Sequence, residues 1–111
     1  MDSILTSIKK MLGIESDYTQ FDADIIIAIN SALMVLNQLG VGLVTDFKIT
    51  DASETWSEYL GEDSSIEGVK TYIYLKTRLI FDPPTSSFVV DSMERLIKEY
   101  EWRIQIQMEG E

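Results

Sequence analysis

The sequence predicts an all-α protein, a small bundle of four to five helices with a C-terminal helical hairpin and one extended loop. A single helical domain is expected over residues 1–111. Apolar residues recur at intervals of three and four along most of the chain, which is the period of an amphipathic helix. Glycines follow three of these periodic stretches, at Gly13, Gly40 and Gly61. Adjacent prolines, Pro83 and Pro84, separate the last two periodic stretches without interrupting either.

The first predicted helix begins at a cap supplied by Ser3 or Asp2 and ends at Gly13. Its inward stripe is expected to comprise Ile4, Leu5, Ile8, Met11 and Leu12. The second predicted helix takes Asp22 as its N-cap and runs to about Leu39.

The second helix is apolar nearly all round. Its main stripe comprises Ile25, Ile29, Ala32, Leu36 and Leu39. Ile27 and Met34 lie towards the other side, which indicates burial on more than one face. Such a helix is either the centre of a bundle or has one face against a partner, and the two interpretations are compatible if subunits assemble. Ile27 and Met34 are therefore candidates for a contact between subunits.

The middle of the chain is expected to be an extended segment over residues 43–50, followed by an acidic stretch over residues 51–67. This stretch holds six acids and no base: Asp51, Glu54, Glu58, Glu62, Asp63 and Glu67. A helix of one or two turns is predicted from Ser53 to Gly61, with Trp56, Tyr59 and Leu60 on its inner face. Charge runs of this kind are usually solvated surface, and the spacing does not match a calcium-binding loop.

The last two predicted helices run from about Ser65 to Phe81 and from about Ser87 to Met108. A short stiff loop between them predicts an antiparallel hairpin. In the first of the two, the expected inward residues are Val69, Tyr72, Ile73, Leu75, Leu79 and Ile80, with Lys70, Tyr74, Thr77 and Arg78 outward. In the second, the expected inward residues are Val89, Met93, Leu96, Ile97, Tyr100 and Ile104.

The composition disfavours most kinds of chemistry. The chain has no cysteine and no histidine, which removes disulfides, thiolate metal sites and the usual general base. No glycine-rich phosphate loop is present, so we predict no catalytic, cofactor-binding or metal-binding residues. The net charge of −10 disfavours tight binding to duplex DNA. The apolar run from Ala23 to Leu36 is shorter than the ~20 residues of a membrane span, so we expect a soluble intracellular protein with no membrane partner.

Five stretches, in order, resemble the phage head–tail connector (adaptor) proteins of tailed bacteriophages and prophages. They are MDSILTSIKKMLGI, FDADIIIAINSALMVLNQLGVG, SETWSEYLG, VKTYIYLKTRLIFDPPTSS and SMERLIKEYEWRIQIQ. The most specific parts are FDPP, Phe81 to Pro84, together with EWR, Glu101 to Arg103. The resemblance covers almost the whole chain.

This resemblance implies a structural virion protein without catalytic residues or cofactors. Family members form a homo-oligomeric ring, commonly a dodecamer, beneath the portal protein and above a stopper or tail-completion protein. DNA passes through the central channel without specific binding. The implied location is the virion at the head–tail interface, with the host cytoplasm as the place of assembly.

The implied contacts lead to two further sets of candidate residues. Candidates for contact with the portal or a neighbouring ring component are Phe81, Asp82, Pro83, Pro84, Trp102, Arg103, Ile104, Ile106 and Met108. Candidates for an acidic channel lining, which would repel phosphates, are Glu54, Glu58, Glu62, Asp63 and Glu67. Local roles are also open: Trp102 as a half-buried aromatic, Asp82 as a turn cap and Arg103 as an ion-pair partner of Glu99.

The alternative function is a small acidic protein-binding module or a DNA mimic. It shares the charge and the helical class, but the acids cluster in one segment, which disfavours mimicry of a long duplex. A small enzyme is the third class, and the missing site motifs disfavour it.

Overall fold

The computed structural model describes residues 3–43, 45–61 and 66–109, and for residues 66 and 67 it describes the backbone. Its five helices are α1 (Ile4–Leu12), α2 (Asp22–Gln38), α3 (Trp56–Leu60), α4 (Ile66–Phe81) and α5 (Ser87–Glu109). The described residues form no strand, although Ser3 and Thr55 make an isolated antiparallel bridge. These features confirm the predicted all-α class.

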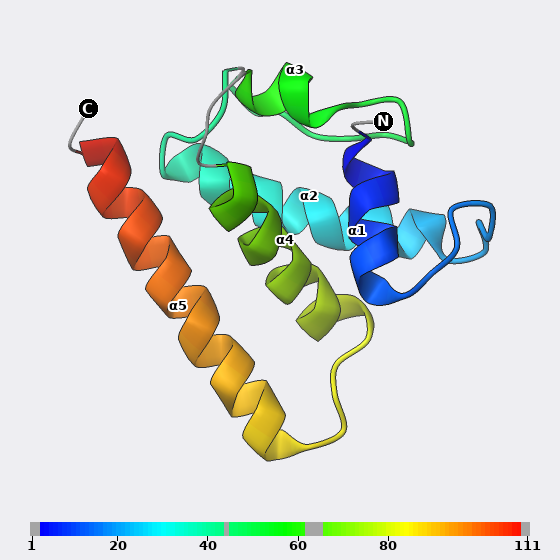
Figure 1. Ribbon diagram of the computed structural model, residues 1–111. Helices are drawn as coiled ribbons and strands as arrows, with labels where there is room; N and C mark the ends of the chain where they lie inside the picture. The colour runs from blue at the N-terminus through cyan, green and yellow to red at the C-terminus, as the bar shows by residue number, and fades with distance from the viewer. Residues whose placement is uncertain (1–2, 44, 62–65, 110–111) are drawn as a thin grey trace.

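The helices form a flat plate measuring 39 × 35 × 20 Å, which is about two helix diameters thick. α4 occupies the middle of the plate and packs against α2, α5 and α1, most extensively against α2. Figure 1 shows α5 along one edge, antiparallel to α4, while the connection between α1 and α2 lies at the opposite edge. The predicted C-terminal hairpin is therefore confirmed. None of the described helices is long and apolar enough to cross a bilayer.

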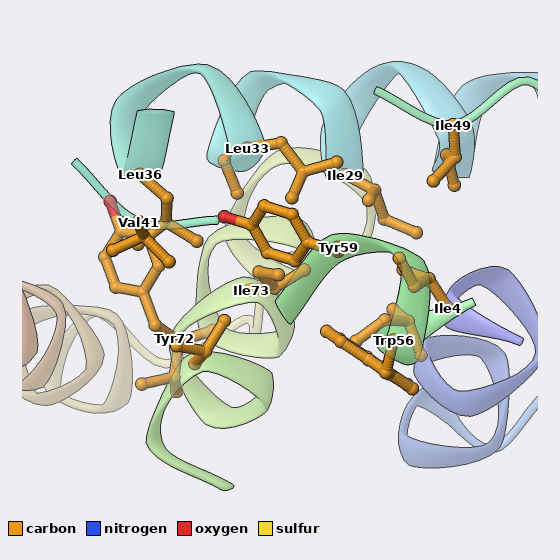
Figure 2. Packing of buried hydrophobic residues seen from close by; sticks show 14 of the residues in the cluster. Ile4, Ile29, Leu33, Leu36, Val41, Ile49, Trp56, Tyr59, Tyr72 and Ile73 are labelled. Carbon is orange, nitrogen blue, oxygen red and sulfur yellow. The ribbon is translucent and has the colours of Figure 1, made fainter. Parts of the chain in front are cut away.

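The core lies between α2, α4 and α1, and Trp56 and Tyr59 of α3 lie among its side chains (Figure 2). α2 contributes the largest apolar set, comprising Ile25, Ala28, Ile29, Ala32, Leu33 and Leu36, all fully buried. Burial of each large aliphatic side chain contributes about 1.5–3 kcal/mol. From α3, Trp56 is 1% exposed and its ring nitrogen donates to Ser7 Oγ at 3.0 Å. The ring of Tyr59 is also buried and stacks on Phe47 with centroids 4.9 Å apart.

The ends of α1 agree with the sequence. Ser3 Oγ accepts from the Thr6 amide at 3.1 Å, and Gly13 has a φ of 84°, which suits glycine. The predicted start of α3 at Ser53 is two residues too early. Thr55, not Ser53, is the N-cap, and it forms a reciprocal capping box with Glu58.

The prediction that Asp22 caps α2 is wrong. Asp22 is the first residue of the helix, and its carboxylate pairs with the Lys9 ammonium at 2.8 Å. The Lys9 side chain is 2% exposed, and it also donates to the carbonyls of Ser16 (3.1 Å) and Tyr18 (2.8 Å). A buried ammonium requires partners for its three donors, and this requirement outweighs a local cap. The result ties the α1–α2 connection to α1.

The predicted extended segment forms an irregular loop in its described residues, 43 and 45–50. The side chain of Asn30 takes the place of a neighbouring strand, because its Nδ2 donates to the Ile49 carbonyl at 2.9 Å and its Oδ1 accepts from the Ile49 amide at 2.8 Å. Before this segment, Gly42 has a φ of 104°, and a Cβ there would lie 2.6 Å from the Tyr59 ring. Both the backbone conformation and the contact with Tyr59 therefore favour glycine at position 42.

Several predicted side-chain orientations are wrong. Thr77, expected outward, is fully buried, because α4 has neighbours on several sides. Ile80 (53% exposed), Val89 (42%), Leu96 (45%) and Met11 (42%) were expected to face inward but are exposed. α5 lies at the edge of the plate and buries one row of residues, Met93, Ile97 and Ile104, so its remaining apolar residues face outward.

Candidate assembly surfaces

An apolar hollow lies between the α1–α2 connection and the C-terminal end of α4. Its lining comprises Ile14, Tyr18, Phe21, Asp24, Ile27, Ile80, Phe81 and Asp82, and we refer to it as the aromatic hollow. Tyr18 is 45% exposed and Ile27 is 67% exposed. A contiguous apolar surface rimmed by polar residues is typical of an interaction site.

Three aromatic rings form a chain across the aromatic hollow. The ring centroids of Tyr18 and Phe21 are 5.8 Å apart, and those of Phe21 and Phe81 are 5.5 Å apart in an edge-to-face arrangement. The Lys9 ammonium holds the carbonyl of Tyr18 at 2.8 Å, so the buried ion pair also positions this surface. The hollow is therefore built by segments far apart in the sequence and held by buried interactions.

The FDPP residues form one side of this hollow. Phe81 is half-buried against Phe21, while Asp82 and Pro83 are exposed and Pro84 is partly exposed. The Arg78 guanidinium donates to the Asp82 carbonyl at 2.7 Å and so closes the end of α4. This bond uses the backbone of Asp82 and leaves its carboxylate at the surface.

Both residues proposed for a subunit contact on α2 are exposed. Ile27 is 67% and Met34 is 56% exposed, and a separation of seven residues places them on one face of the helix. Ile27 lines the aromatic hollow, whereas Met34 lies about two turns further along α2. The structure therefore joins Ile27 to Phe81 and Asp82 in one surface.

A second surface is the outward face of α5, opposite its buried row. Its most exposed apolar residues are Phe88 (74%), Trp102 (63%), Ile106 (49%) and Leu96 (45%). Arg103 on this face pairs with Glu99 at 2.5 Å, the local arrangement considered from the sequence. Ile104 differs from its neighbours, because it is 8% exposed and packs into the core, so it supports α5 from inside. Met108 is half-buried at the end of the same inner row.

The inner side of α5 adds a smaller groove of about 260 Å³. Its lining includes Val41, Gly68, Val69, Tyr100, Ile104 and Met108. Near it, the Tyr72 hydroxyl donates to Glu101 at 2.6 Å and joins α4 to α5. Burial, and then the adjacent Glu101 carboxylate, raise the pKa of Tyr72 well above its ordinary value, so the hydroxyl keeps the proton that it donates.

The described acids proposed for the channel lining have local partners. The Glu54 carboxylate accepts from the Thr50 amide (3.0 Å), the Thr50 hydroxyl (2.8 Å) and the Asp51 amide (3.2 Å). Burial alone raises the pKa of Glu54, but these hydrogen bonds outweigh it and lower the pKa below its ordinary value. Glu58 completes the α3 capping box.

The other three proposed acids lie outside the described side chains. Glu62 and Asp63 fall beyond the described residues, and Glu67 belongs to α4 with its backbone described. Within the described residues, 3–43, 45–61 and 66–109, no group of three or more acidic side chains has the arrangement of a metal site.

Sequence reasoning missed Tyr18, Phe21 and Ile80 as surface residues. A signal for the first two is present, because they are isolated bulky aromatics within the polar stretch ESDYTQFD. No such signal exists for Ile80, which fits the inward period of α4 and is exposed because the helix ends there.

Comparison with known families identifies one match. The family described as "Phage connector protein" matches residues 4–111, which is nearly the whole chain. Searches of curated proteins and of solved structures find no significant match. The match agrees in extent with the five helices of the structure. The chain belongs to the phage connector protein family.

Proposed function

We propose that this protein is a structural, non-enzymatic component of the virion that forms a ring under the portal. The ring joins the capsid to the tail-completion proteins and lets DNA pass through its channel. The observation that carries this proposal is membership of the connector family over nearly the whole chain. The exposed apolar surfaces support it, because a protein that remained alone would leave Ile27, Phe88 and Trp102 in water.

Electron microscopy of the purified protein, alone and mixed with the portal protein encoded nearby, tests this proposal. We expect rings with a central hole stacked coaxially on the portal, with about twelve subunits as the family resemblance implies. A monomer that does not bind the portal protein at any salt concentration would refute the proposal. Binding of that monomer to a basic nucleic-acid-binding protein would instead favour the acidic binding module or DNA mimic.

We further propose that the C-terminal part of α5 contacts the portal through Trp102 and Ile106. These residues are four apart, exposed and on the outward face of the helix. Deletion of residues 104–111 would also remove the buried Ile104, so point substitutions are the sharper test. Trp102→Ala combined with Ile106→Ala should weaken portal binding by about 30-fold or more, as expected for hot-spot residues.

The matched control for this contact is Gln105→Ala, an exposed polar residue of the same segment. It should bind the portal as the wild type does. Far-ultraviolet circular dichroism should show unchanged helix content in all the variants. Equal affinity of the double variant and the control would remove Trp102 and Ile106 from the proposed contact.

The acidic stretch is proposed to border the channel, where negative charge would limit sticking of DNA during passage. Reversal of charge in Glu62→Lys with Asp63→Lys should preserve assembly and slow DNA ejection. The neutral pair Glu62→Gln with Asp63→Asn should slow ejection less. Ejection at the wild-type rate in the lysine variant would contradict the proposal.

A further inference from the structure

We infer that the aromatic hollow of one subunit receives the N-terminal half of the outward face of α5 from a second copy of this chain. The inference rests on the proposed ring and names the two surfaces that make its subunit contact. The α5 residues concerned are Phe88, Val89 and Leu96 with Arg95 among them, and we refer to them as the α5 ridge. Trp102 and Ile106, near the other end of α5, remain for the portal.

The two surfaces lie on different sides of the plate, so one subunit can present both at once. The aromatic hollow lies between the α1–α2 connection and the C-terminal end of α4. In Figure 1 that connection lies at one edge of the plate and α5 at the opposite edge. The outward face of α5 points away from α4, because its opposite row is buried against the core. A contact between two different patches on different sides of the subunit is head-to-tail, and repetition of such a contact closes into a ring when the rotation between successive subunits completes a full turn.

The shapes and chemistry of the two surfaces agree. The aromatic hollow is concave and apolar, with the Tyr18, Phe21 and Phe81 rings across it. The α5 ridge is a convex helix face whose leading residue, Phe88, is 74% exposed. Apolar helix faces dock into apolar grooves in this manner in many complexes.

Charge complementarity selects the second copy as the occupant. Asp24 and Asp82 stand in the lining of the hollow, and neither has a basic partner within ion-pair distance in the described part of the chain. Arg95 lies on the α5 ridge, seven residues after Phe88, and among the described residues it too has no carboxylate partner. It makes one long hydrogen bond, 3.4 Å from Ser92 Oγ.

The distribution of charge along the chain agrees with this pairing. Residues 1–65 hold eleven acids and three bases, whereas residues 66–111 hold eight acids and six bases. The hairpin of α4 and α5 therefore carries most of the basic side chains. A head-to-tail contact that places Arg95 of one copy beside Asp24 and Asp82 of the next would pair unlike charges.

Engineered cysteines test the contact directly, since the chain has none of its own. The variant Ile27→Cys with Leu96→Cys carries one cysteine in the hollow and one on the ridge. Both native side chains are exposed, at 67% and 45%, so the substitutions should leave the core intact. Oxidation of this variant on the portal should give a ladder of covalent dimers, trimers and larger species on a non-reducing gel.

Three controls make the result specific. Each single-cysteine variant should remain monomeric on the gel, because a head-to-tail contact does not bring identical positions together. The pair Ile27→Cys with Gln105→Cys, which moves the second cysteine away from the ridge, should give no ladder. Microscopy of the same samples should show rings in every case.

Charge reversal supplies a second measurement. Arg95→Glu should raise the protein concentration needed for half-assembly by about tenfold or more, because like charges would meet across the contact. The control Lys98→Glu changes the charge on the same helix outside the ridge and should have a smaller effect. Equal effects of the two variants would contradict the assigned surfaces.

The outcomes separate this inference from the proposed function. Rings without a ladder would overturn the pairing of hollow and ridge and leave the connector role intact. Dimers from a single-cysteine variant would show a two-fold contact and would overturn it too. Failure of the wild type to form rings or bind the portal would refute the proposed function, and the inference with it.

Discussion

The buried Lys9 ammonium is expected to be a principal stabilising feature of the fold, and Lys9→Met tests this. In the native state the ammonium contacts the Asp22 carboxylate at 2.8 Å and donates to the carbonyls of Ser16 and Tyr18. Methionine has a similar length but no donor. The substitution therefore leaves one carboxylate and two carbonyl oxygens without their partner.

The magnitude follows from the burial of the two charges. Removal of one partner from a buried ion pair typically costs about 3–5 kcal/mol. The Asp22 side chain is 25% exposed, so water reaches it in the variant and relieves part of the loss. We expect unfolding free energy to fall by about 2–4 kcal/mol, which lowers the melting temperature by roughly 10–20 °C.

Chemical denaturation followed by circular dichroism measures this loss, and Lys10→Met is the matched control. Lys10 is the next residue on α1 and is exposed, so its loss should change stability by at most about 0.5 kcal/mol. A double-mutant cycle with Asp22→Asn should show that the two losses are not additive. If Lys9→Met were as stable as Lys10→Met, the assigned role of the ion pair would be wrong.

Three further changes test other parts of the structure. Gly42→Ala should lower the unfolding free energy by about 2–3 kcal/mol in the same denaturation assay, because the new methyl group clashes with Tyr59 and the backbone is strained. The control Gly40→Ala, with a φ of 93° and no atom within 4 Å of the new methyl group, should show the strain alone, at about 1 kcal/mol. Tyr72→Phe should lose about 1.5–3 kcal/mol, the contribution of a hydrogen bond to a charged group, and unchanged stability would show that the hydroxyl does not join α4 to α5. Because the pKa of Glu54 is lowered in the folded state, its contribution to stability is present above the ordinary pKa of 4.5 and is lost as the pH falls through the folded pKa. Glu54→Gln should therefore be less stable than the wild type at neutral pH and should lose less stability on acidification. Melting temperatures of the two proteins that change in parallel with pH would contradict this.

The helices and their ends were largely determined by local sequence. Ser3 and Gly13 bound α1, and the prolines 83 and 84 end α4, because capping and backbone restriction act within a few residues. The apolar period placed most of the core correctly for α2, where Ile25, Ile29 and Leu36 are fully buried. The same pattern favoured a central position for α2, but the structure places α4 in the middle of the plate and leaves Ile27 and Met34 of α2 exposed.

The surfaces of the last hairpin depended on how many neighbours each helix has. α4 is covered on several sides, so Thr77 is buried although its sequence position suggested an outward face. α5 lies at an edge, so Val89 and Leu96 are exposed although they fit its inward period. Periodicity reports which side chains are apolar, but it does not report how wide a face the neighbouring helices cover.

The candidate surfaces show the same division between local and tertiary information. Sequence alone identified the FDPP turn and the exposed Ile27, and the family resemblance that rests on such residues is confirmed. It did not indicate that Phe81 and Ile27 share one hollow with Tyr18. It also missed the Lys9–Asp22 pair that holds the connection beside that hollow. Both features join residues distant in the chain, and they exist because helix packing brings α1, α2 and the end of α4 together.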